Sequence, residues 1–452
     1  MRLSLPECMR DVRPVLLLTA LLAGCAVSPD SDIQREPAAT ASGESPTEFV
    51  APDIKDIWPI STRYYRTTSA DIYLGNVDAQ IVSLEANVAA GLVDRSERLA
   101  GLLYHRYKLL GRLSDSDRAI ELLASRADAN FLTPSGMVLY AITLSGLHRF
   151  DEADAWLQKA RTAGAAEEEW RDLGKDILVA RGDYAALAQD FATSNLPVAD
   201  FYGLAHRADL RLLQGDLAGA ESHFLAAQTL YRDVSPVPLA WLHTQMGIAY
   251  LRYGRIDDAR RFFTAAIERL PGYYLAEEHL AECETLLGEL PAARERYQKV
   301  IAQTGNPEFV AALSALERQA GNTELADSLI EQAKVGYSDL LSRLPAAYAQ
   351  HASEFFAEIG ETDRAYQLAR ENASLRSDVG SLILLAASAE GAGKPKAACR
   401  AHARAVATML TPPELAELKA VSRRCAKAAE SLNDAGFADQ PKPDTAASAL
   451  QH

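Results

Sequence analysis

Apolar and polar residues repeat with a helical period along most of this chain, and the amphipathic segments come in pairs. One residue suited to a tight turn separates the two segments of each pair. Successive turn residues are 34, 33, 39, 34, 33, 39 and 33 positions apart. This spacing predicts an all-α chain of antiparallel helix pairs stacked side by side. The turn residues are His148, Gly182, Gly215, Gly254, Gly288, Gly321, Gly360 and Gly393.

A small side chain follows most of these turns by five residues, early in the second helix of each pair. Leu187, after Gly182, is the exception. Small residues at this position let the two helices cross closely, because larger side chains would hold them apart. The residues are Ala153, Ala220, Ala259, Ala293, Ala326, Ala365 and Ala398.

The unit from Trp241 to Pro271 shows the pattern most completely, and its residues resemble the tetratricopeptide repeat. His243 departs from the pattern, since Trp or Leu is usual there. The resemblance implies a right-handed α-solenoid of about eight to nine helix pairs, a fold that binds proteins. The matching residues are Met246, Gly247, Tyr250, Gly254, Ala259, Phe263, Ala266 and Pro271.

The two steps of 39 residues predict second helices prolonged over Tyr231–Val234 and Tyr337–Leu344. About five extra helical residues add roughly 7–8 Å of length. Such ends could serve as binding ledges or only adjust the packing. At the array's two ends, we expect a helix over 78–92, a diverged repeat over 99–127 with a long turn at 112–116, and a helix from Pro412 to about Leu432 capped by Thr411.

The N-terminus has the parts of an export signal. Arg10 and Arg13 precede an apolar run that is too short to span a bilayer. The run ends in Leu22-Ala23-Gly24-Cys25, which resembles the lipobox of bacterial lipoproteins and implies acylation of Cys25. Ala26 resembles the outer-membrane class, so we expect a lipid-anchored protein facing the periplasm. The alternatives are an ordinary signal with an incidental cysteine, and a start at Met9.

These features predict a modular chain. Residues after Cys25 are rich in Ser, Ala and Pro and lack large apolar groups, which is typical of a flexible tether. The expected parts are a lipoprotein signal over 1–25, a tether over 26–57, N-terminal helices with a diverged repeat over 58–130, the repeat array over 131–408, a capping helix over 411–433 and a disordered tail over 434–452.

Charge narrows the class of partner. The chain has 61 acidic and 46 basic residues and a formal net charge of -15. Nucleic-acid binding needs clustered Lys and Arg to neutralise phosphates, and anionic lipid surfaces need the same. We therefore expect protein partners that are basic or neutral, although the charge could also serve solubility alone.

Motifs that carry catalysis or bind a cofactor are not found in the sequence. We therefore predict no enzymatic activity, no cofactor and no metal. His279 and Cys283 share a helical face as zinc ligands might, but Cys283 takes the repeat position of Ala249, which favours a core role. Cys399 and Cys425 lie on elements that should pack together, so a disulfide between them is one of two open outcomes.

The first helix of each tetratricopeptide pair lines the concave face, which is the default contact surface. An apolar and aromatic stripe flanked by acids there suggests a groove for an extended or helical protein segment. Packing of Trp241 against the prolonged helix end before it is the alternative. The candidate contact residues are Tyr202, Asp209, Trp241, Thr244, Ile248, Leu251, Glu278, Glu282 and Arg318.

The expected function is that of an envelope scaffold, which binds protein partners during assembly or regulation of a larger complex. It resembles the tetratricopeptide lipoproteins that help assemble pilus secretins or recruit murein hydrolases, over the leader and about residues 98–408. The alternative is a component of polysaccharide export. An envelope hydrolase is the least favoured interpretation, and fold alone does not decide between them.

Overall fold

The computed structural model describes residues 66–193 and 201–436, and all regular structure in these ranges is helical. The expected all-α solenoid is confirmed. The signal with Cys25, the tether and most of the expected tail lie outside the described residues. In the described part, no helix combines the length and apolar character needed to cross a membrane.

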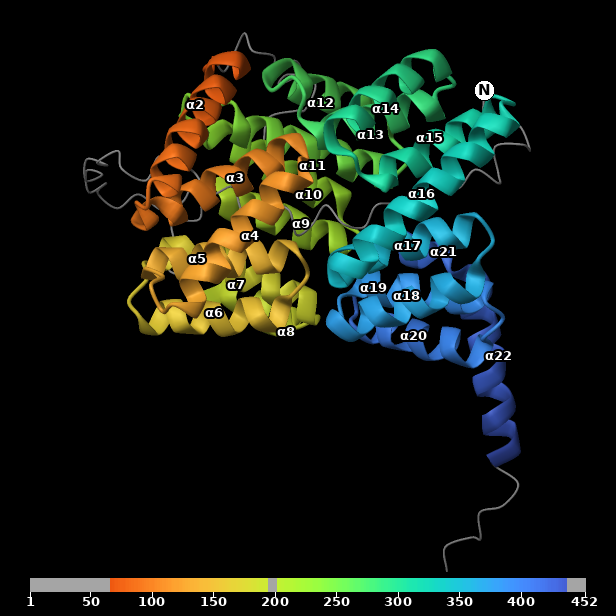
Figure 1. Cartoon of the computed structure of the whole chain (residues 1–452). Coiled ribbons are helices and arrows are strands. Elements are labelled where there is room, and N and C mark those ends of the chain that lie inside the picture. The colour runs from red at the N-terminus through yellow and green to blue at the C-terminus, as the bar shows by residue number, and fades with distance from the viewer. Residues whose placement is uncertain (1–65, 194–200, 437–452) are drawn as a thin grey trace, which may run out of the picture.

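The helices follow one another as packed antiparallel pairs, from α3 with α4 to α19 with α20 (Figure 1). In chain order they are α2 Ala70–Ala89, η3 Val93–Arg95, α3 Ser96–Leu110, α4 Leu113–Asp128, α5 Pro134–Gly146, α6 Phe150–Thr162, α7 Glu167–Arg181, α8 Tyr184–Thr193, α9 Phe201–Leu213, α10 Leu217–Leu230, α11 Val237–Arg252, α12 Ile256–Arg269, α13 Tyr274–Leu286, α14 Leu290–Thr304, α15 Pro307–Gln319, α16 Thr323–Arg343, α17 Pro345–Glu358, α18 Thr362–Leu375, α19 Val379–Gly391, α20 Pro395–Ala407, α21 Pro413–Glu417 and α22 Lys419–Gly436.

Every predicted turn residue has a left-handed backbone. The seven glycines have φ between 65° and 84°, and His148 has φ 57°. Glycine adopts this conformation without the steric cost that a Cβ atom brings. The seven predicted alanines are all fully buried, with 0% exposure, as close helix crossings require.

One of the two predicted prolonged helices forms. α16 continues to Arg343, whereas α10 ends at Leu230, so the prediction for Tyr231–Val234 is wrong. Pro236 disfavours helical geometry in the residue before it and has no amide to donate. The segment instead forms a loop, in which the Tyr231 hydroxyl donates to the Ser235 carbonyl.

Both ends of the array also differ in detail from the prediction. The first expected helix is longer, since α2 begins at Ala70. The diverged repeat is present as α3 and α4, but its turn is short because left-handed Gly111 ends α3. At the other end, the capping segment is broken into α21 and α22. Thr411 does not cap it, since its hydroxyl donates to the Gln214 carbonyl.

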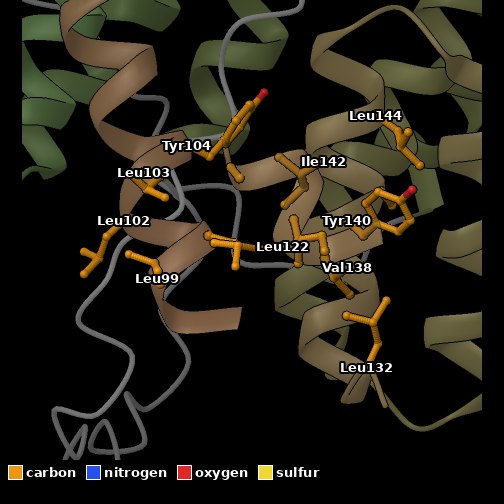
Figure 2. Close-up of a cluster of buried hydrophobic side chains, with 14 of the residues drawn as sticks. Leu99, Leu102, Leu103, Tyr104, Leu122, Leu132, Val138, Tyr140, Ile142 and Leu144 are labelled. Carbon is orange, nitrogen blue, oxygen red and sulfur yellow. The ribbon is translucent and has the colours of Figure 1, made fainter. Parts of the chain in front are cut away.

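The buried apolar side chains form a series of local clusters along the array. The first extends from α2 to α7, and Figure 2 shows part of it, including Leu99, Leu122 and Val138 from three successive helices. Most of each cluster is built by neighbouring helices, as expected of a repeat array. Two clusters also include side chains from distant helices, Leu213 in one and Leu110 in the other.

Candidate protein-binding face

The nine predicted contact residues do not form one exposed stripe. Trp241, Thr244 and Ile248 of α11 are 6%, 0% and 5% exposed, so a partner does not reach them in this conformation. Whether the others bind a partner stays a prediction. Among them, Glu278 is buried, Tyr202, Asp209, Leu251 and Glu282 are partly buried, and Arg318 is exposed.

Trp241 has a packing role. Its ring lies 5.7 Å from that of Tyr202 and 6.3 Å from that of Phe201, measured between ring centroids. Both partners belong to α9, so the indole packs within the fold. The alternative had expected it to pack against a prolonged helix end before it, but α10 ends at Leu230. The aromatic character that suggested a groove serves the contact between successive pairs instead.

A different set of side chains gathers on the first helices of three later pairs. On α13, the imidazole of His279 lies between two carboxyl groups: its Nε2 is 3.0 Å from Glu278 Oε1 and its Nδ1 is 3.3 Å from Glu282 Oε2. The His279 and Glu278 side chains are almost fully buried, with 4% and 5% exposure. Ionisable side chains are therefore buried on a helix where a repeat array ordinarily buries apolar side chains.

The same arrangement recurs on α17. His351 Nδ1 lies 3.3 Å from Glu308 Oε1 of α15 and 3.9 Å from Glu354 Oε2. Glu308 stands in the first turn of α15, where the helix dipole favours negative charge. Glu358, one further turn along α17, is exposed. We call this set the acidic inner face: Glu278, His279, Glu282, Glu308, His351, Glu354 and Glu358.

Electrostatic coupling joins these groups across the three helices. His351 and His279 both act on the Glu308 carboxyl, and Glu282 acts on that of Glu358. Burial raises the pKa of the Tyr107, Tyr274 and Tyr348 hydroxyls, and Glu308 lies close enough to add to this effect; these residues belong to α3, α13 and α17. A helix from the start of the array therefore meets the acidic inner face.

Burial raises the pKa of several of these carboxyls because a charge is poorly solvated there. The pKa of Glu354, whose side chain is largely buried, rises to about 7. Burial acts to lower the pKa of His351, but Glu308 outweighs it and raises the value to about 9. Glu308 itself keeps a lowered pKa despite burial, because of His351. At neutral pH the face thus carries a partial negative charge.

Sequence reasoning found Glu278 and Glu282 but missed Glu308, His351, Glu354 and Glu358. A signal for two of them exists in the repeat register. His279 and Glu282 stand nine and six residues before Gly288, and His351 and Glu354 stand nine and six before Gly360. The His-x-x-Glu pair therefore recurs at one repeat position. No comparable signal marks Glu308, which comes from the intervening unit.

Part of this face has a composition that could ligate a metal. One ligand atom from each of Glu278, His279 and Glu282 lies within 4.8 Å of the others. Both imidazole nitrogens already face a carboxyl oxygen, however, so the three side chains are partners for one another.

The cysteines occupy two kinds of site. Cys399 of α20 and Cys425 of α22 form a disulfide, with Cα atoms 5.5 Å apart. Cys283 is a free, fully buried thiol on α13, and burial raises its pKa. That is the core role expected from its place in the repeat.

The comparisons with known proteins identify the repeat. Residues 250–316 match the family model described as Tetratricopeptide repeat. No curated protein matches the chain.

Solved structures similar to this chain include other helical-repeat proteins. The human IFIT1 dimer with PPP-AAAA is 15% identical, with 74% of this chain and 87% of that one covered and a TM-score of 0.37. A tetratricopeptide repeat protein from Parabacteroides merdae ATCC 43184 is 18% identical, covering 49% and 98% at a TM-score of 0.27. The P58(IPK) TPR domain is 14% identical, covering 82% and 97% at 0.27. The segment from Tyr250 of α11 to Leu316 of α15 thus carries the tetratricopeptide repeat by sequence, within an array of helix pairs that extends to both sides of it.

Proposed function

We propose that this protein is a lipid-anchored scaffold of the bacterial cell envelope that binds a basic segment of a protein partner. Tetratricopeptide repeats build protein-interaction scaffolds generally, and residues 250–316 match that family. The envelope assignment rests on the sequence Leu22-Ala23-Gly24-Cys25 behind its apolar run. Acyl chains on Cys25 would hold the body at the membrane, since two or more chains give stable anchoring.

One observation carries the partner class. Carboxyl groups from α13, α15 and α17 meet on one face with only two imidazoles among them, so acids are in excess. Lys or Arg side chains of an extended or helical segment would complement this charge and be guided towards it. Glu358, the exposed member, is the natural point of first contact.

A photo-crosslinking residue at position 358 tests the binding face in cells. We expect it to capture a protein, and the same residue at Glu371, an exposed acid on the neighbouring helix α18, to capture none or a different set. Glu358→Lys should abolish the interaction, and Glu371→Lys, with the same change in charge, should preserve it. Equal capture from both positions would refute this face as the binding site.

The anchor has its own test. Cys25→Ser removes the acylated thiol, so the protein should move from the membrane fraction to the soluble periplasmic fraction. Retention of the variant on the membrane would contradict the anchor without affecting the binding face. Capture of polysaccharide-export components at position 358 would favour that alternative over other assembly roles.

A further inference from the structure

Four of the hydrogen bonds between residues far apart in sequence have a nearly constant separation. Hydrogen bonds join Gln303 to Leu110, Ala346 to His148, Val379 to Tyr184 and Thr411 to Gln214. The separations are 193, 198, 195 and 197 residues. A constant offset is the signature of one superhelical turn lying against the next.

The same structural elements meet each time. On the earlier turn of the superhelix, the contact is made by a helix-pair turn or the residues beside it, at Gly111, His148, Gly182 and Gly215. On the later one, it is made by the junction between two pairs. The four junctions lie at Gln303–Thr304, Ala346, Ser377–Val379 and Thr411. We call this line of contacts the inter-turn seam.

Most seam contacts use backbone groups. The Ser377 amide donates to the Ala180 carbonyl at 2.8 Å, and the Thr411 amide donates to the Leu213 carbonyl at 3.0 Å. Beside the second contact, Arg252 forms a two-pronged ion pair with Glu414 of α21, at 2.6 and 3.0 Å. Both partners are buried, with 6% and 5% exposure, so this pair is shielded from solvent.

Glycine is required in the seam for more than its backbone angle. A Cβ atom on Gly182 would lie 2.5 Å from the Ser377 carbonyl oxygen, and one on Gly215 would lie 2.6 Å from that of Thr411. Gly254 and Gly288 have the same left-handed backbone at the same place in their repeats, but a Cβ on them would meet nothing within 4 Å. Gly182 and Gly215 thus lie against the other superhelical turn, whereas Gly254 and Gly288 do not.

We infer that the inter-turn seam is a latch that holds successive superhelical turns together and controls access to the inner helix faces. Figure 1 shows the block α5–α8 beside the block α17–α20, where Tyr184 meets Val379. Few apolar side chains cross the seam: Leu213 and Tyr184 pack against the cluster of Val379, and Leu110 packs against that of Tyr273. The helix pairs are joined by more extensive buried apolar packing, so the seam separates before the pairs do. The role of the opening in partner access rests on the proposed function, but the latch itself does not.

The glycines supply a matched experiment on the full chain. Gly182→Ala with Gly215→Ala should open the seam, and Gly254→Ala with Gly288→Ala should impose only the backbone strain. We expect the seam variant to have a larger radius of gyration by small-angle scattering and about tenfold less exchange protection at the Ser377 and Thr411 amides than the control. Equal values in the two variants would overturn the latch.

A milder variant guards against misfolding. Tyr184→Phe with Thr411→Val removes two side-chain hydrogen bonds from the seam and preserves size, so it should also lower protection at these amides. Access is measured by alkylation of a Glu282→Cys thiol, whose side-chain position is 14% exposed. Opening should speed alkylation about tenfold over the control, and an unchanged rate would disprove control of access. None of these measurements uses a partner, so they fail or succeed independently of partner binding.

Discussion

Single atoms decide several of the close approaches in this array. Gly247 of α11 lies so near the ring of Phe263 that a Cβ atom would come within 2.5 Å of it. Phe263 is fully buried. Gly174 of α7 is also within a helix, yet a Cβ there would meet nothing within 4 Å. The same residue type therefore serves packing at one position and has no packing role at the other.

Substituting these two glycines should change stability in opposite directions. Gly247→Ala forces the aromatic ring or the helix to shift, which we expect to lower the free energy of unfolding by about 1–3 kcal/mol. Gly174→Ala should raise it by about 0.5–1 kcal/mol, because alanine favours the helix. Urea denaturation of both variants checks this. Equal changes in the two variants, or a gain in Gly247→Ala, would show that helix crossing does not select Gly247.

Element by element, the sequence predicts what local chemistry decides. The turns and the buried alanines follow from residue type at a fixed spacing, and both were predicted. The end of α10 at Leu230 was not predicted, because the spacing of the turns does not distinguish a longer helix from a longer loop. Pro236 was the residue that indicated a loop.

The acidic inner face could be predicted only in part, because it depends on packing between helices as well as on local sequence. Recurrence of His-x-x-Glu marks two helices, but the meeting of Glu308 with His351 depends on how α15 packs on α17. The buried state of Trp241, Thr244 and Ile248 likewise depends on neighbouring elements. The position of a residue within a repeat identifies a contact residue only if the concave face forms an open groove. In this chain α3 contacts α13 across the superhelix, so part of that face is covered.

The C-terminal cap is a separate element with its own stability. The Cys399–Cys425 disulfide and an ion pair between Arg424 and Glu390 fasten α22 to α20 and α19. The disulfide closes a loop with a sequence separation of 26 residues, which corresponds to about 3 kcal/mol of stabilisation in the chain-entropy description.

Loss of this disulfide should loosen the cap alone. Cys425→Ser is expected to raise amide exchange in α22 and leave α3–α16 unchanged, since repeats couple mainly to their neighbours. Cys283→Ala serves as the control, because it alters a buried thiol elsewhere in the array. Exchange in α22 that is the same with and without the disulfide would show that packing, not the covalent bond, holds the cap.

At the scale of the whole molecule, buried ionisable groups couple stability to pH. Burial alone would lower the pKa of both His206 and His351, but Asp176 with Asp172, and Glu308 respectively, raise the values to about 9. A histidine whose pKa is higher in the folded state stabilises the fold fully below its unfolded pKa of about 6.5. That contribution is lost as pH rises through about 9. His105 and His243 act in the opposite sense, because burial lowers their pKa values to about 4 and about 3.

Above about pH 6.5, the raised pKa values of His206 and His351 predict a loss of stability, because the folded state then releases protons that the unfolded state has already lost. From pH 7 to 9 the loss should be roughly 2 kcal/mol for each of these two histidines. Chemical denaturation at pH 7 and 9 measures the drop, and His351→Gln should reduce it by about half while lowering stability at pH 7. If the variant and the parent lose equal stability over this interval, the His351–Glu308 pair is not the source of the dependence, and the charge assigned to the acidic inner face must be revised with it.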